Sequence, residues 1–312
     1  MKRFSSIVLA AAIALPGLAH AQNSCKFAEL LNLPVSKLKN SVALQVTGEI
    51  NGKPVSMGLS TGTFRTFIMR QEMEKQNVPM EETTDRVRNT QGRQWIYEAL
   101  LRDVSIGPLH TQNRRFPVIK PAHDTPFAAV LGADFLLQTD VELFLSKGQV
   151  KFFQSADCAD RGLSYWDPDA IVVPLLRKDR DARPLINVTI NGVKGRALLD
   201  TGAARSTVLL HFAQLAGFDR YKAKEDRKYF DAFQPEDVKV WKGDFAEFAI
   251  DNEVIRQPEL TVSSRTRDRD SAYDMILGLD FLMAHRILIS VSQEKVYLSY
   301  VGGEVFSSAN KW

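Results

Sequence analysis

The chain has 312 residues, of which 45% are apolar and 25% charged, an ordinary globular composition. The net charge is +3, and acidic and basic residues are interspersed, so the pI of 8.7 does not indicate a nucleic-acid partner. The length suits two modest domains or one bilobed domain.

The first 21 residues have the pattern of a secretory signal peptide. A basic start is followed by an apolar run from Ile7 to Leu15 and then by Ala19-His20-Ala21, a small-x-small cleavage site. The run is far shorter than the roughly 20 apolar residues that span a bilayer, which argues against an uncleaved anchor. We expect cleavage before Gln22, a periplasmic or secreted mature chain, and no membrane insertion after cleavage.

Cys25 and Cys158 are the two cysteines of the chain. In an oxidising compartment, two cysteines most simply form one disulfide, which would tie the mature N-terminus to residues near 158. Two free thiols are the alternative. A metal site is not expected, because the five histidines and two cysteines form no cluster with ligand spacing.

An internal duplication organises the rest of the chain. At an offset of 140, the motif Ile50-Asn51-Gly52 recurs as Ile190-Asn191-Gly192, and Ser60-Thr61-Gly62 recurs as Asp200-Thr201-Gly202. At an offset of 146, the block 131–136, Leu-Gly-Ala-Asp-Phe-Leu, recurs at 277–282. A loop between the blocks can absorb the difference. The copies span 31–154 and 171–301, with a linker at 155–170.

Each copy is mostly β in its patterning. Strand-like runs end at Asn-Gly, a strong hairpin signal, and later segments alternate apolar and polar residues. One short helix is expected in each copy, with another after each Leu-Gly-x-Asp block. In chain order, the predicted elements are strands at 42–50, 141–145, 150–153, 186–190, 287–291 and 296–300, helices at 69–76 and 210–216, and a solvated charged loop at 265–270.

An Asp-Thr-Gly tripeptide alone is weak evidence, but its surroundings strengthen it. The apolar strand 197–199 leads directly into Asp200, small and hydroxyl residues follow, and the Leu-Gly-x-Asp block comes later in both copies. Each copy therefore resembles a lobe of a retropepsin-like aspartic peptidase, and the pair resembles the bilobed, pepsin-type arrangement. The resemblance covers nearly all of the mature chain and implies an all-β fold with two lobes about a pseudo-twofold axis.

In that family, one aspartate from each lobe shares a proton with its partner, and one of them activates water while the other polarises the scissile carbonyl. The resemblance implies that Asp200 is catalytic and that Thr201 and Gly202 hold its turn, with Thr61 and Gly62 in the first copy. It also implies that Gly278 lets a strand cross close behind the turn. Asp280 and its counterpart Asp134 are expected to cap local structure.

Ser60 departs from this pattern, because it stands where the second catalytic aspartate would be. A hydroxyl can bind Asp200 or a water, but it cannot share a titratable proton near neutral pH. No histidine pattern marks Ser60 as a nucleophile. We expect it to maintain the hydrogen bonds of the turn.

The family also closes hairpin flaps over a bound peptide. The segment 87–101 fits such a hairpin, with its tip near Gly92 and with Trp95 as a residue that either contacts substrate or packs across the strands. The segment 229–248 of the second copy has no glycine before Gly243, so a second flap is doubtful.

Three functions remain open. The first is an exported aspartic endopeptidase that uses Asp200, with a homodimer as one way to supply a second carboxylate. The second is an inactive pseudopeptidase that binds an extended peptide or a protein partner between the lobes. The third is an adaptor that does not use the cleft. No cofactor is implied by any of them.

Overall fold

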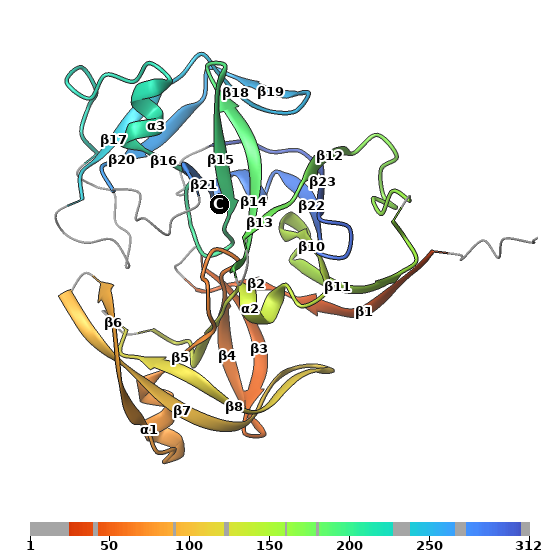
Figure 1. Ribbon diagram of the computed structural model, residues 1–312, viewed down its shortest axis with the longest axis vertical. Coiled ribbons are helices and arrows are strands. Elements are labelled where there is room, and N and C mark those ends of the chain that lie inside the picture. The colour runs from red at the N-terminus through yellow and green to blue at the C-terminus, as the bar shows by residue number, and fades with distance from the viewer. Residues whose placement is uncertain are drawn as a thin grey trace, which may run out of the picture.

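The computed structural model describes residues 25–39, 43–89, 92–121, 125–159, 161–178, 181–226, 238–265 and 273–306. The predicted signal peptide lies outside these residues, as do 229–237 of the segment considered for a second flap and 266–270 of the predicted charged loop. The fold is all-β, as predicted, and is built from two repeats (Figure 1). None of the helices in the described ranges is long and apolar enough to cross a membrane.

The first lobe is built around an eight-stranded sheet, in the lower half of Figure 1. Its strand order is β2-β3-β4-β9-β5-β8-β7-β6. A short helix follows β5 and another follows β9, as the sequence predicts. The elements are β2 (Ser36–Lys37), β3 (Leu44–Ile50), β4 (Lys53–Leu59), β5 (Phe67–Met69), α1 (Arg70–Gln76), β6 (Glu81–Asn89), β7 (Gly92–Ile106), β8 (Leu109–Ile119), β9 (Ala129–Leu131) and α2 (Ala133–Leu136).

The second lobe repeats this plan in the upper half of Figure 1. Its sheet runs β17-β20-β16-β21-β15-β14-β18-β19, with β13 paired to β14. The elements are β13 (Leu176–Lys178), β14 (Asp181–Ile190), β15 (Val193–Leu199), β16 (Thr207–Leu209), α3 (Leu210–Leu215), β17 (Val240–Asp244), β18 (Glu247–Ile250), β19 (Glu253–Arg256), β20 (Glu259–Ser263), β21 (Met275–Leu277) and α4 (Leu279–Leu282).

A third sheet joins the two lobes, in the order β1-β11-β10-β22-β23-β12. At its centre Glu142 pairs with Leu288, its own counterpart at the offset of 146, so the pseudo-twofold axis passes through this pair. The elements are β1 (Lys26–Pro34), β10 (Asp140–Phe144), the 3-10 turn η1 (Leu145–Lys147), β11 (Gln149–Ala156), β12 (Ile171–Pro174), β22 (His285–Ser290) and β23 (Lys295–Tyr300).

The two Asn-Gly turns form the predicted hairpins. Asn51 and Gly52 have φ of 53° and 77°, and Asn191 and Gly192 have 49° and 77°, as a type I′ turn requires. The Asn191 Oδ1 atom accepts a 2.8 Å hydrogen bond from the amide of Ala246, so this turn also holds the segment that leads into β18.

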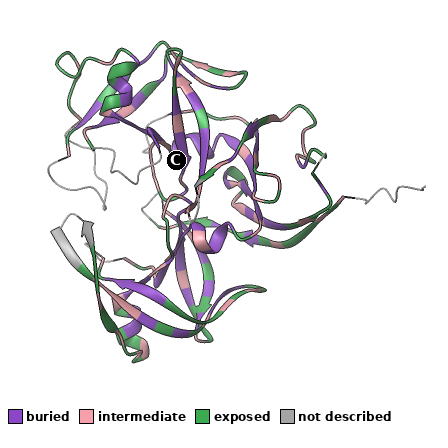
Figure 2. Cartoon of the chain, viewed as in Figure 1, coloured by how far each residue is buried: buried purple, intermediate pink, exposed green. Residues whose placement is uncertain are grey.

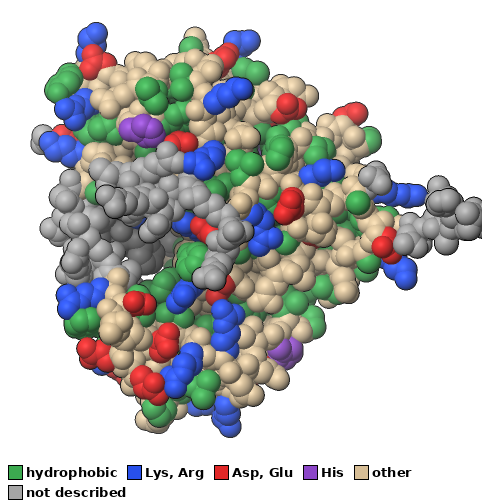
Figure 3. All heavy atoms as spheres, viewed as in Figure 1, with side chains coloured by type: hydrophobic (Ala, Val, Ile, Leu, Met, Phe, Trp, Pro, Cys, Tyr) green, Lys and Arg blue, Asp and Glu red, His purple; other side chains and the backbone are tan. Residues whose placement is uncertain are grey.

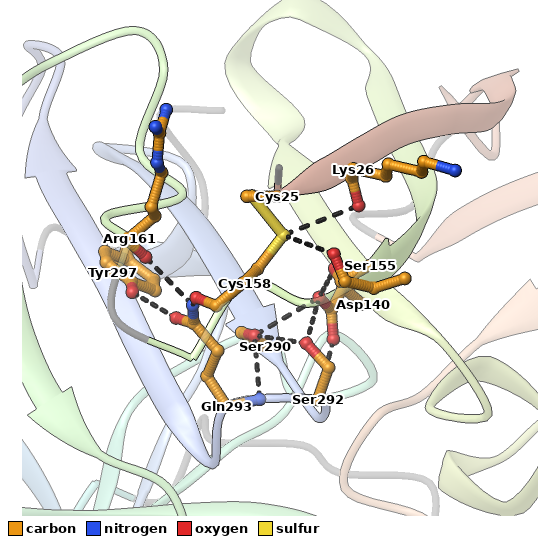
Figure 4. The surroundings of a disulfide bond; sticks show 11 residues. Cys25, Lys26, Asp140, Ser155, Cys158, Arg161, Ser290, Ser292, Gln293 and Tyr297 are labelled. Carbon is orange, nitrogen blue, oxygen red and sulfur yellow. Dashed lines mark hydrogen bonds between the residues drawn. A yellow bond between two sulfur atoms is a disulfide. The ribbon is translucent and has the colours of Figure 1, made fainter. Parts of the chain in front are cut away.

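The predicted disulfide is present between Cys25 and Cys158 (Figure 4). It fastens the start of β1 to the segment that follows β11. The side-chain amide of Gln293, in the turn between β22 and β23, donates to the carbonyl oxygens of Cys158 and Arg161. The disulfide-bonded segment is therefore tied to the second lobe as well.

Buried residues occur in all three sheets (Figure 2). One continuous hydrophobic core contains residues of both lobes, among them Ile50, Met57, Phe212 and Phe281. Because the core and the third sheet are shared, the two lobes form one packed body that fixes how their turns meet.

Candidate active site

The two motif turns begin where β4 and β15 end. The amide of Ser60 donates to the carbonyl of Leu131 at 3.0 Å, and the amide of Asp200 donates to the carbonyl of Leu277 at 3.0 Å. These bonds extend the parallel pairings β4–β9 and β15–β21 by one residue. Residues 60 and 200 therefore stand at equivalent places, one in each lobe.

Reciprocal hydrogen bonds lock the turns together. The amide of Thr61 donates to Oγ1 of Thr201 at 3.1 Å, and the amide of Thr201 donates to Oγ1 of Thr61 at 3.1 Å. The Thr61 hydroxyl also donates to the carbonyl of Leu199 at 2.7 Å. Both threonines are 1% exposed, so water cannot replace these partners. The sequence-predicted residues Thr61 and Thr201 thus join the two lobes.

Each glycine of the motif lies against the other lobe's key residue. A Cβ atom on Gly62 would stand 2.2 Å from Cγ of Asp200, and one on Gly202 would stand 2.5 Å from Oγ of Ser60. Ordinary carbon contacts are about 3.5–4.0 Å. Any side chain at either position would therefore push residues 60 and 200 apart, which accounts for the two glycines.

Asp200 is held through its Oδ1 atom. This oxygen accepts bonds from the amide of Gly202 at 2.7 Å, the amide of Gly62 at 3.0 Å and the hydroxyl of Ser60 at 3.0 Å. The Ser60 hydroxyl lies 2.6 Å from Oγ1 of Thr63. The structure thus brings Ser60 and Asp200 together, 140 positions apart in sequence, with two donors from the first lobe on one carboxylate.

The Leu-Gly-x-Asp blocks support both turns from behind. A Cβ atom on Gly132 would stand 2.5 Å from the backbone carbon of Arg65, and one on Gly278 would stand 2.7 Å from that of Arg205. The strand can pass so close to the turn only without a side chain. This confirms the expectation for Gly278 and gives Gly132 the same role.

Asp134 and Asp280 are local caps, as the sequence predicts. Asp280 Oδ1 accepts from the amide and hydroxyl of Ser206 at 2.8 and 2.6 Å, and Asp134 Oδ1 accepts the same pair of bonds from Thr66 at 2.7 and 2.8 Å. Burial raises the pKa of Asp280 to about 6, against the opposing effect of the bonds from Ser206.

A guanidinium lies beside the Asp200 turn. In the β14–β15 pairing, Leu185 is opposite Leu198. Extending this register by two residues places Arg183 opposite Asp200. The Arg183 guanidinium donates to both carboxylate oxygens of Asp181, from Nε to Oδ1 at 3.0 Å and from Nη2 to Oδ2 at 2.7 Å. Its pKa is raised, chiefly by the hydrogen bond to Asp181, with a smaller electrostatic contribution from Asp200. In the first lobe the β3–β4 register places Ala43 opposite Ser60, so this positive charge has no counterpart there.

The first predicted flap is a hairpin of β6 and β7, in which Asn89 pairs with Gly92 next to the tip. Trp95 faces Arg86 across the strands, and the Arg86 guanidinium carbon lies 3.7 Å from the centre of the Trp95 ring. The ring is 39% exposed. Residues 90 and 91, which follow Asn89 in the chain, lie outside the described residues. In the second lobe Trp241 is buried, so it packs in the core.

Sequence reasoning missed two residues of this site. Thr63 and Arg183 stand at positions where the other copy has Ala203 and Ala43. Aligning the two copies and noting each position where one has a polar residue and the other has alanine would have found both. In the described parts of the chain, no group of three or more His, Cys, Asp or Glu side chains is placed to hold a metal ion.

Two interlocked Thr-Gly turns at the junction of two β lobes define a bilobed, retropepsin-like aspartic peptidase fold. A family model described as gag-polyprotein putative aspartyl protease matches the chain twice, over residues 46–138 and 186–284. The matches cover more than half of the chain, and each contains one motif turn. The chain therefore belongs to this aspartyl protease family. No curated protein matches it significantly.

Proposed function

We propose that this protein is an exported endopeptidase in which Asp200 activates water to hydrolyse peptide bonds. The observation that carries the proposal is the intact setting of Asp200. Its Oδ1 accepts three hydrogen bonds, and the turns around it are locked by Thr61 and Thr201. A structural turn would not need a carboxylate at this place.

In the proposed reaction, the Asp200 carboxylate takes one proton from a water molecule while the water oxygen bonds to the scissile carbonyl carbon. The carbonyl double bond opens, and its electron pair moves to the oxygen. Asp200 then returns the proton to the amide nitrogen as the C–N bond breaks. The products are one carboxylic acid and one amine, and Asp200 is ionised again. Arg183, beside the turn, favours the negative charge that Asp200 carries at the start.

An extended peptide is the substrate class that fits best, because a β6–β7 hairpin is present where a flap is expected and carries Trp95, which is 39% exposed. Side chains of both signs are mixed over the coloured part of the face seen in Figure 3. Export is supported by the signal-peptide pattern and by the Cys25–Cys158 disulfide.

Ser60 favours a second candidate, a pseudopeptidase that binds a peptide without cleaving it. The hydroxyl replaces one of two catalytic acids, and members of a catalytic unit fail together. A homodimer that pairs the Asp200 residues of two chains is disfavoured. It would have to break the Thr61–Thr201 bonds and open the sheet in which Glu142 faces Leu288.

The test is cleavage of a diverse peptide library by mature protein 22–312, read by mass spectrometry. Wild type is compared with Asp200→Asn and with Thr47→Val, an exposed substitution on β3. The proposal predicts products from wild type and Thr47→Val, and none from Asp200→Asn. No products from wild type, together with peptide binding, would support the pseudopeptidase instead.

A further inference from the structure

At the Ser60 position, the hydroxyl that replaces the second aspartate is in contact with another hydroxyl, that of Thr63. Thr63 Oγ1 lies 2.6 Å from Ser60 Oγ, which lies 3.0 Å from Asp200 Oδ1. The second lobe has Ala203 where the first has Thr63. Two of the differences between the motif turns, Ser for Asp and Thr for Ala, therefore occur together and in contact.

The direction of these hydrogen bonds follows from the number of protons. An ionised carboxylate has none, so Ser60 must donate to Asp200. Ser60 has a single hydroxyl proton, so Thr63 must be the donor in the short contact between the two hydroxyls. The chain of donors runs from Thr63 to Ser60 to Asp200, and it places a neutral O–H group against the carboxylate.

A pair of aspartates presents the same arrangement only over a limited range of pH. One acid must be protonated to donate to the other, and this proton is lost as the pH rises. A serine hydroxyl does not titrate in this range.

We infer that Ser60 and Thr63 together replace the protonated carboxyl of an aspartic dyad, so that the site needs one ionisation and retains its activity at neutral pH. This inference rests on the proposed function. Ser60 is the donor to Asp200 and, once Asp200 has taken the proton of water, to the new oxyanion. Thr63 is a positioning residue that keeps the Ser60 proton directed at that acceptor. No proton is transferred from either hydroxyl.

In the part of the chain that the structure describes, the charged groups near the two turns already contact other side chains. Asp181 is paired with Arg183, and Tyr273 lies under that guanidinium, whose carbon is 6.0 Å from its ring centre. Arg205, which follows the second-lobe turn, pairs with Asp226 at 3.6 Å. Arg65, which follows the first-lobe turn, lies over Phe64. Arg183 is the cation whose pKa includes an electrostatic contribution from Asp200.

The first experiment is the pH profile of kcat/KM from pH 3 to pH 9 for wild type and Ser60→Asp. Wild type should rise once and then stay level through neutral pH. Ser60→Asp should give a bell-shaped profile that falls as the pair loses its last proton. A bell-shaped wild-type profile would overturn the inference while leaving Asp200-dependent cleavage intact.

Variants at the two hydroxyls test the donor chain. Ser60→Ala should lower kcat/KM by roughly 100-fold, the usual effect of removing one oxyanion donor. Thr63→Val should lower it roughly 5- to 10-fold, the equivalent of one hydrogen bond, and Thr63→Ser should restore it. Thr47→Val is the control. An unchanged rate in Ser60→Ala would contradict the inference.

A binding measurement separates failure of this inference from failure of the proposed function. The probe is a peptide in which a hydroxyethylene group replaces the scissile amide, so no turnover is needed. Its Kd for wild type should be constant from pH 5 to pH 8, should rise with pH for Ser60→Asp, and should weaken in Ser60→Ala. If wild type cleaves no peptide but its Kd values follow this pattern, the role assigned to Ser60 and Thr63 stands and the endopeptidase proposal fails. Equal binding by wild type and Ser60→Ala would overturn the assignment.

Discussion

Thr61 and Thr201 each accept, on the side-chain hydroxyl, a hydrogen bond from the backbone amide of the other, at 3.1 Å in both directions. The two residues come from different lobes and are 140 positions apart. Their exchange fixes the distance between Ser60 and Asp200, the neighbouring residues in the chain. The geometry of the site is therefore a property of the lobe junction.

Substituting Thr61 should destabilise this junction. In Thr61→Val the buried amide of Thr201 loses its acceptor, and the carbonyl of Leu199 loses a donor. Each buried group left without a partner costs about 1–3 kcal/mol. The free energy of unfolding in urea should fall by that order, whereas Thr47→Val, exposed on β3, should change it by less than about 0.5 kcal/mol. Equal losses of unfolding free energy in the two variants would show that the hydrogen bonds of Thr61 do not stabilise the protein.

The motif glycines should tolerate no side chain. Gly62→Ala would place a methyl group 2.2 Å from Cγ of Asp200, and Gly202→Ala would place one 2.5 Å from Oγ of Ser60. Both should abolish cleavage and lower stability by roughly 1–3 kcal/mol, as overpacking does. Gly162→Ala is the matched control, because no atom lies within 4 Å of its Cβ position. Wild-type activity in Gly62→Ala would show that the turns do not meet as described.

Stability should depend on pH through Asp280. Burial raises its pKa in the folded protein to about 6 from an ordinary value of 3.8. The folded state therefore binds the proton more tightly than the unfolded state. The stabilising contribution is complete below about pH 4 and is lost as the pH rises through 6.

Asp280→Asn keeps an acceptor for Ser206 but cannot ionise. Its loss of stability between pH 4 and pH 7 should therefore be smaller than that of wild type by about 2 kcal/mol. Urea unfolding at the two pH values measures this difference. An identical pH dependence in wild type and variant would remove Asp280 as its source.

The disulfide should stabilise the protein by closing a long loop. Cys25 and Cys158 are separated by 133 positions, and cross-links of this length contribute about 2–5 kcal/mol. Guanidinium unfolding with and without dithiothreitol should show that loss for wild type. The double variant Cys25→Ser/Cys158→Ser should start from the lower stability and should not respond to the reductant. A response of equal size in the double variant would assign the effect to another cause.

The sequence predicted the elements that depend on local signals. The Asn51-Gly52 and Asn191-Gly192 dipeptides predicted the two hairpins, because a type I′ turn needs positive φ at both central residues and this depends only on the local sequence. The glycines in the Leu-Gly-x-Asp blocks predicted the close crossing behind each turn. The disulfide followed from the number of cysteines and the expected compartment.

Features that depend on pairing across the chain were not predicted. The strand at 26–34 was missed because it is an edge strand whose partner, β11, begins more than 100 residues later. Arg183 was missed because its place opposite Asp200 depends on the register of β14 against β15. The contact of Thr63 with Ser60 follows only once the turn is folded.

The most direct test of the central claim is kcat/KM for one cleaved peptide at neutral pH, measured for wild type and Asp200→Asn. Asn keeps the shape of the side chain and an acceptor oxygen for Ser60, Gly62 and Gly202. It cannot take a proton from water. We predict a loss of at least about 1,000-fold. A variant that cleaves at the wild-type rate would show that Asp200 is not the catalytic base.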